Sequence, residues 1–235
     1  MLDHHVATRE DWLAARKALL EEEKEFTRAR DAVSVKRRAL PWVKIDKPYS
    51  FEGPGGALSL GDLFGPKRQL IVYHFMFAPD WEKPCKSCSF WADGFNGAVA
   101  HLAERDTALV AVSRAPLAKL ETRKRKMGWS FPWVSSGDGD FNYDFSVSFR
   151  DEDLAAGTAT YNYAARQGTI KDLPGISAFV KDDGGAVYHT YSCFARGLDM
   201  MNPAYNYLDL TALGRQEEGL PFPMSWVRLR DEYEA

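Results

Sequence analysis

The sequence predicts an α/β fold of three layers, in which a central mixed sheet is covered by helices on both faces. Residues 69–78 and 106–114 are apolar runs without alternation, which is typical of strands buried on both faces. A stretch with helical spacing follows each run. Residues 175–192 then form two strand-like halves around an Asp-Asp-Gly-Gly turn, a hairpin signal. Parallel strands joined through a helix, followed by an antiparallel hairpin, make a mixed sheet.

The first 45 residues differ in composition from the rest of the chain. They contain few glycines and many strong helix formers, and Thr8 is suited to cap a helix with Asp11 three residues on. We therefore expect a helical extension over residues 1–45 and a core domain over 46–235. The apolar side chains of this helix could pack on the core or on a second copy, so a homodimer is one interpretation.

The remaining elements follow in order. Residues 49–69 are rich in glycine and proline and predict a loop with a hairpin. Residues 85–105 predict one helix, because apolar side chains recur at spacings of three and four. Residues 115–128 predict a second helix that Gly128 ends, and residues 205–215 predict a last one.

Composition narrows the function classes. The 235 residues carry 30 Lys and Arg against 33 Asp and Glu, a net charge of −3, so no basic face for nucleic acid is expected. No apolar run reaches the roughly 18 residues of a membrane span. Three cysteines are too few for a disulfide framework, and the charged start does not suit a secretory signal. These features favour a cytoplasmic protein.

Two cysteines form a C-x-x-C pair between the first buried strand and the following helix. A C-x-x-C pair near a β-α-β pattern is a redox signal. We expect the first turn of the helix, with Lys83 and Lys86, to stabilise a thiolate at Cys85. Cys88 would then resolve a mixed disulfide formed at Cys85. Two buried structural thiols are the alternative.

This order of elements is that of the thioredoxin fold, and long motifs make the resemblance narrower. From about residue 42 to residue 233 the chain resembles the DUF899 family, thioredoxin-like proteins found in bacteria. The segments that carry the resemblance include "IVYHFMFAPDW", "CKSCSFWADGFNG", "MGWSFPWVSS", "HTYSCFARGLD" and "YNYLDLTALGR". The resemblance implies a thioredoxin-like fold and a site at the cysteine pair. It does not imply a particular reaction.

Three positions depart from the thioredoxin and peroxiredoxin patterns. Trp81 stands four residues before Cys85, where thioredoxins have tryptophan directly before it. Ser177 stands where thioredoxins place a cis-proline that docks substrate. Peroxiredoxins have Thr or Ser three residues before the peroxidatic cysteine, whereas this chain has Glu82. The last departure argues against a peroxidase of that type.

The sequence also predicts the surroundings of the pair. The residues expected to bind substrate are Trp81, Lys86, Trp91, Arg114 and Ser177. Aromatic residues are dense between positions 128 and 145, where they could line a pocket for a flat ligand or fill an ordinary core. His74, in the middle of a strand, is interpreted as a core histidine.

The function predicted first is a thiol–disulfide oxidoreductase that acts on a protein or small-molecule disulfide or thiol, without a cofactor. A non-catalytic binding or scaffold protein of the same fold is the alternative. A metal site is less favoured; its four ligands would be Cys85, Cys88, His189 and Cys193. Acidic residues at alternate positions within 136–144 resemble part of a calcium loop, but lack its glycine and distal glutamate.

Overall fold

The structure is a computed structural model that describes residues 4–233, and the chain divides into two compact units between Pro41 and Trp42. The first unit contains helix α1 (Arg9–Arg38). The Thr8 hydroxyl accepts a hydrogen bond from the Asp11 backbone N–H at 3.1 Å, so the predicted cap is confirmed. Acidic residues lie in the first turn of α1 and basic residues in the last, as the helix dipole favours. A homodimer built on this helix stays a prediction.

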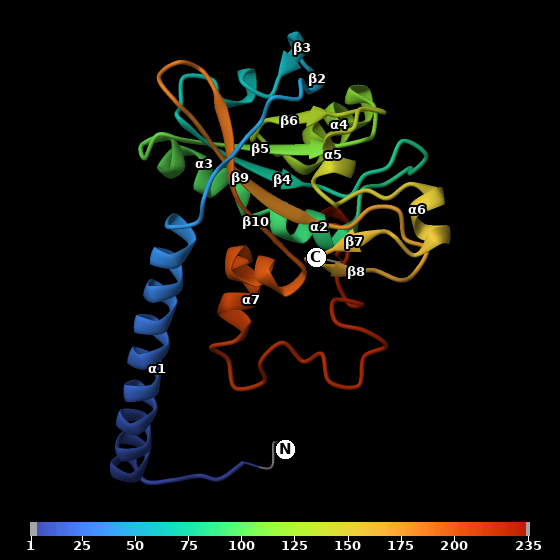
Figure 1. Cartoon of the computed structure of the whole chain (residues 1–235). Coiled ribbons are helices and arrows are strands. Elements are labelled where there is room, and N and C mark those ends of the chain that lie inside the picture. The colour runs from blue at the N-terminus through green and yellow to red at the C-terminus, as the bar shows by residue number, and fades with distance from the viewer. Residues whose placement is uncertain (1–3, 234–235) are drawn as a thin grey trace. The chain divides into compact units, whose positions relative to one another are not determined.

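The second unit is built on a mixed sheet (Figure 1). Its strands in chain order are β1 (Val43–Lys44), β2 (Ser50–Gly53), β3 (Gly56–Ser59), β4 (Gln69–His74), β5 (Thr107–Ser113), β6 (Trp133–Ser135), β9 (Gly175–Lys181) and β10 (Val187–Phe194). Their spatial order is β1-β10-β9-β4-β5-β6-β2-β3. Strands β4, β5 and β6 are parallel, and β9 pairs antiparallel with both β4 and β10. The predicted parallel unit and hairpin are therefore confirmed.

Helices and short 3-10 turns connect these strands. The helices are α2 (Lys86–Ala92), α3 (Phe95–Ala103), α4 (Leu117–Met127), α5 (Phe141–Asp144), α6 (Asp151–Ala156) and α7 (Pro203–Leu208). The 3-10 turns are η1 (Asp62–Phe64), η2 (Ala195–Met201) and η3 (Arg230–Glu232). A separate hairpin joins β7 (Thr160–Tyr161) to β8 (Ala164–Ala165). Within residues 4–233, no helix combines the length and the apolar character that crossing a membrane requires.

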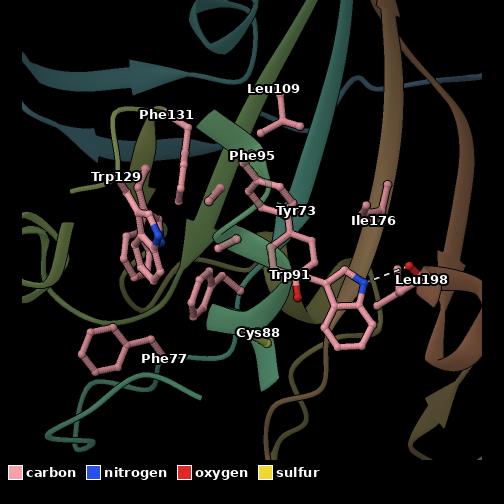
Figure 2. Packing of buried hydrophobic residues seen from close by; sticks show 14 of the residues in the cluster. Tyr73, Phe77, Cys88, Trp91, Phe95, Leu109, Trp129, Phe131, Ile176 and Leu198 are labelled. Carbon is pink, nitrogen blue, oxygen red and sulfur yellow. Dashed lines mark hydrogen bonds between the residues drawn. The ribbon is translucent and has the colours of Figure 1, made fainter. Parts of the chain in front are cut away.

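The strands bury both faces of the sheet, and their side chains alternate between two apolar clusters. Tyr73 of β4 belongs to the first cluster, which includes side chains from α2, α3 and α4 and is drawn in Figure 2. Its neighbour Val72 belongs to the second, which includes side chains from η1 and α5. Helices thus cover both faces, and the fold is the thioredoxin-like three-layer fold that the sequence predicts.

Two predicted elements differ in extent, and one strand was not predicted. The single helix expected over residues 85–105 is interrupted at Gly94, where an added Cβ would lie 3.2 Å from the ring of Pro203. The Pro203 ring thus packs against the turn between α2 and α3. The helix expected over residues 205–215 ends at Leu208, and the short strand β6 was not predicted.

The aromatic stretch between residues 128 and 145 fills the core, so its interpretation as a pocket lining is wrong. Trp129, Phe131 and Trp133 are buried in the first cluster, and Phe141 and Phe145 in the second. Edge-to-face and offset ring contacts join these rings to neighbouring aromatics. Only Trp133 belongs to strand β6; the other four aromatics lie before that strand or in and after α5, and all five are buried.

Candidate functional site

The cysteine pair lies beside the carboxyl end of β4. After that strand the chain loops out and returns, so that the Cys85 backbone N–H donates to the Met76 carbonyl at 3.0 Å. Cys85 then caps α2, and Cys88 lies in its first turn. Cys85 is half-buried, whereas Cys88 is 1% exposed. The structure therefore presents one accessible thiol with a second, enclosed thiol behind it.

Hydrogen bonds and burial shift the pKa values of the two thiols in opposite directions. The Cys88 thiol, followed by the backbone N–H groups of Cys88 and Ser87, lowers the pKa of Cys85 to about 7. Burial raises the pKa of Cys88 well above its ordinary value. Near neutral pH, Cys85 is the thiol that ionises and Cys88 keeps its proton.

Tyr73 is a neighbour of the pair that sequence reasoning missed. Its hydroxyl is hydrogen-bonded to the Cys88 side chain, and burial raises the pKa of Tyr73 well above its ordinary value. Tyr73 therefore stays protonated as a donor. In Figure 2, Tyr73, Trp91 and Cys88 lie together on one side of the sheet. The alternation of β4 was a usable signal, because residues 71, 73 and 75 share the face that packs on α2.

The predicted substrate-binding residues on the cysteine side have different environments. Trp91 lines the cavity described below, with its indole N–H bound to the Leu198 carbonyl at 2.8 Å. Trp81 is partly buried against the first core cluster. The Lys86 ammonium donates to the Ser225 carbonyl at 2.9 Å, and Lys83 pairs with Glu232 at 2.7 Å. The two lysines thus contact other parts of the chain and are not among the causes of the lowered pKa of Cys85.

Ser177 does not occupy the predicted rim. It is fully buried, and its hydroxyl bonds His74 Nε2 at 2.9 Å and Ser192 Oγ at 2.8 Å. His74 is the core histidine that the sequence predicts. The rim position directly before β9 belongs to Pro174, which lines the cavity beside the cysteines. None of the described peptide bonds is cis, so Pro174 is a trans-proline at that place.

Arg114 also lies outside the cavity lining, and its charge is neutralised by Asp172. It donates to both oxygens of Asp172 at 2.9 and 2.8 Å and to the Tyr143 hydroxyl at 3.0 Å. Ser148 adds a hydrogen bond to Asp172 at 2.6 Å. The pair fixes the segment that leads to Pro174 against the end of β5, which is a structural role.

A cavity of about 1040 Å³ opens onto Cys85 and Cys88. Most of the residues that line it come from the chain beyond β10, which includes η2, α7 and the turns that follow. The residues from this part that line it are Ala195, Arg196, Leu198, Asp199, Tyr205, Asp209, Leu213, Gly214, Arg215, Gln216, Glu217, Glu218, Pro223 and Met224. Sequence reasoning missed this wall, because its polar turns carry no periodic pattern.

The structure does not assemble the four-ligand metal site. His189 bonds Ser192 and packs against the rings of Phe145 and Phe179 in the second cluster, whereas Cys193 packs in the first. The two faces of the sheet separate them. In the part of the chain that the structure describes, no group of three or more His, Cys, Asp or Glu side chains could hold a metal ion.

Two carboxylates of the calcium-like stretch, Asp140 and Asp144, form ion pairs with basic side chains. Asp140 forms ion pairs with Lys47 and Arg150, and Asp144 pairs with Lys47 and accepts from Tyr49. These contacts fasten α5 and its flanks to the neighbouring loops. The resemblance to a calcium loop therefore has a structural explanation.

A family model for DUF899, described as a bacterial protein of unknown function, matches residues 1–233. The chain belongs to the DUF899 family. The match confirms the resemblance carried by the motifs around the cysteine pair. No curated protein matches this DUF899 chain.

Solved structures similar to this DUF899 chain include several peroxiredoxins. Peroxidoxin BcpB from Mycobacterium tuberculosis is 14% identical, with a TM-score of 0.47, over 69% of this chain and 93% of that one. Peroxiredoxin Q from Xanthomonas campestris is 16% identical, with a TM-score of 0.46, over 72% and 96%. The mitochondrial 2-Cys peroxiredoxin from Plasmodium falciparum is 12% identical, with a TM-score of 0.41, over 71% and 91%. Identities this low do not show which reaction the site of this chain carries out, so its chemistry is inferred from the geometry of the site itself.

Proposed function

We propose that this DUF899 protein is a thiol–disulfide oxidoreductase in which Cys85 attacks and Cys88 resolves. The observation that carries the proposal is the asymmetry of the pair. Cys85 is half-buried at a cavity wall and has a pKa lowered to about 7 by Cys88 and nearby backbone N–H groups. Cys88 is enclosed behind it and has a raised pKa. A thiolate with a pKa near ambient pH is the best attacking group in disulfide exchange.

The reaction balances as two successive exchanges. The Cys85 thiolate attacks one sulfur of a substrate disulfide, forms a mixed disulfide and expels the other half as a thiolate. Cys88 then loses its proton and attacks the Cys85 sulfur, which forms the Cys85–Cys88 disulfide and expels the second half. Two electrons pass from the pair to the substrate, and an external thiol restores the reduced pair. The cytoplasmic location predicted from the sequence would supply such thiols.

Two donors support the second step. The Tyr73 hydroxyl and the Met76 backbone N–H, the latter at 3.5 Å, both reach the Cys88 sulfur. Burial opposes a charge on Cys88, and hydrogen bonds to the thiolate offset part of that cost. Cys88 can therefore become nucleophilic when Cys85 is tied up in a mixed disulfide.

A second candidate is a protein that binds a ligand in the cavity without chemistry at the cysteines. The cavity favours it, since its volume is that of a pocket for a small molecule. In this case the pair would react no faster than ordinary buried thiols.

The deciding experiment exposes the fully reduced protein to dithiodipyridine, an uncharged disulfide, and then maps its peptides by mass spectrometry. We expect a Cys85–Cys88 disulfide and the loss of two hydrogens, with the thiopyridyl group trapped on Cys85 at early times. A Cys193→Ala variant is the control and should behave like the wild type, because Cys193 packs outside the cavity lining. A thiopyridyl group on Cys88 with Cys85 unmodified would contradict the assigned roles, and no disulfide at all would favour the binding protein.

A further inference from the structure

We propose that the cysteine pair acts on a small, largely apolar disulfide without negative charge, and that the chain's own residues 209–226 keep protein disulfides away from it. We name residues 209–226 the roof segment. This inference rests on the proposed function and adds the class of substrate. It follows from the size of the cavity, the fastening of the roof segment, and the balance of charge on the wall.

The cavity has the dimensions and chemistry of a small-molecule site. Its volume of about 1040 Å³ suits a drug-sized ligand, and it is continuous with the reactive thiol. Apolar and aromatic side chains from both parts of the wall surround it, namely Tyr73, Met76, Trp91, Leu198, Tyr205 and Met224. A ligand with an aromatic or alkyl body would bury its surface against these groups while its sulfurs meet Cys85.

The roof segment consists of turns (Figure 1), yet it is held firmly in place. Glu217 Oε1 accepts three hydrogen bonds, from the Tyr205 hydroxyl at 2.6 Å, the Trp226 indole N–H at 2.7 Å and the Met224 backbone N–H at 2.8 Å. Hydrogen bonds to a carboxylate are about twice as strong as those between neutral groups. Glu217 therefore joins the middle of the roof segment to its end and to α7.

Two further contacts fasten the roof segment near the cysteines. Arg215 makes a bidentate pair with Asp209, with both distances 2.7 Å, and reaches Asp199 of η2 at 3.1 Å. Lys86, next to Cys85, donates to the Ser225 carbonyl at 2.9 Å. In thioredoxin-type exchange with a protein, an extended segment of the substrate protein must lie along the rim beside the attacking thiol. Here the chain itself forms the far wall over the pair, so only a substrate that fits the cavity reaches Cys85.

The charges on the wall argue against an anionic substrate. Two arginines, Arg196 and Arg215, line the cavity together with four carboxylates. Both arginines are paired with the chain's own carboxylates. The wall thus carries more carboxylates than arginines, and its excess negative charge would repel a phosphate or a polyanionic thiol.

The test compares three disulfides with the fully reduced, full-length protein: dithiodipyridine, which is uncharged and aromatic; dithiobis(nitrobenzoate), which is a dianion; and insulin, which is a protein. Each rate is divided by the rate of the same reagent with dithiothreitol, because the reagents differ in intrinsic reactivity. We expect the normalised rate to be highest for dithiodipyridine and about tenfold or more lower for the other two.

The matched variant is Glu217→Ala, which removes three fastenings of the roof segment, with Glu22→Ala on the exposed surface of α1 as control. Glu217→Ala should raise the normalised insulin rate about tenfold and reduce the preference for dithiodipyridine. The control should leave both unchanged. Equal normalised rates for insulin and dithiodipyridine in the wild type, or an insulin rate that Glu217→Ala does not change, would overturn the inference while leaving the proposed function intact.

A binding measurement separates this inference from the redox proposal. Dipyridylethane is the carbon analogue of dithiodipyridine and cannot exchange sulfur. We expect it to quench the fluorescence of Trp91 and Trp226, in the wild type and in Cys85→Ser alike, because both indoles lie at or beside the cavity. Failure of the wild type to form the Cys85–Cys88 disulfide with any reagent would refute the proposed function. Absence of saturable quenching would refute the small-molecule site.

Discussion

Replacing Cys85 by serine is expected to lower the rate of dithiodipyridine reduction by about a thousandfold or more, because a serine hydroxyl does not ionise near neutral pH and cannot form a disulfide. Cys88 cannot take over the attack, since it is 1% exposed and its pKa is raised by burial. The rate of thiopyridone release under substrate excess measures the effect. Far-UV circular dichroism and the denaturation midpoint establish that the variant is folded.

The Cys88→Ser variant provides the matched comparison, because it removes only the second exchange. We expect it to release one equivalent of thiopyridone per protein and to stop as a mixed disulfide on Cys85, whereas the wild type releases two. The Cys193→Ala control should follow the wild type within about twofold. A Cys85→Ser protein that retains most of the activity would rule out Cys85 as the nucleophile.

The second large effect concerns the ion pair between Arg114 and Asp172, whose side chains are 12% and 6% exposed. We expect Arg114→Met to lower the free energy of unfolding by about 3–5 kcal/mol, since it leaves the Asp172 carboxylate buried without its charged partner. Urea denaturation followed by tryptophan fluorescence measures the loss. The segment that contains Asp172 leads to Pro174 at the cavity rim, so ligand binding should weaken as well.

Lys171 offers the matched control one residue away. It pairs with Asp151 at 2.7 Å, but both side chains are more than half exposed. Lys171→Ala should therefore cost less than about 1 kcal/mol. The double variant Arg114→Met with Asp172→Leu should lose less than the sum of the two single changes, because no buried charge remains unpaired. An Arg114→Met loss as small as that of Lys171→Ala would contradict a buried structural pair.

The fold was predictable because its central strands carry strong local signals. Residues 69–74 and 107–113 are mostly apolar and each include β-branched side chains, and the hairpin turn at residues 182–185 is marked by its Asp-Asp-Gly-Gly sequence. The end of α4 was equally clear, since Gly128 adopts a left-handed conformation with φ of 66°. The break in the helix at Gly94 was missed, although glycine is a poor helix former; the Pro203 ring that packs against this turn comes from a distant part of the chain.

The site was predictable only in part, and the misses have definite physical causes. Local sequence order placed Cys85 and Cys88 correctly after a buried strand. Ser177 was misplaced, because a shift of a few positions along an extended chain changes both the face of the sheet and the distance from the rim. That shift puts Ser177 against His74 and leaves Pro174 at the cavity. Arg114 and Lys86 were expected at a ligand, but they contact chain segments that no local pattern connects to them.

The most direct test of the account measures how fast iodoacetamide alkylates each cysteine between pH 5 and pH 10, in the full-length reduced protein. Alkylation requires the thiolate, so the rate should rise with pH and level off above the pKa of the thiol. The account predicts that the alkylation rate of Cys85 has its midpoint at about pH 7. It also predicts that near pH 7 Cys85 reacts faster than Cys88 and Cys193. A midpoint for Cys85 near 9, the ordinary value for a thiol, or faster modification of Cys88, would contradict it.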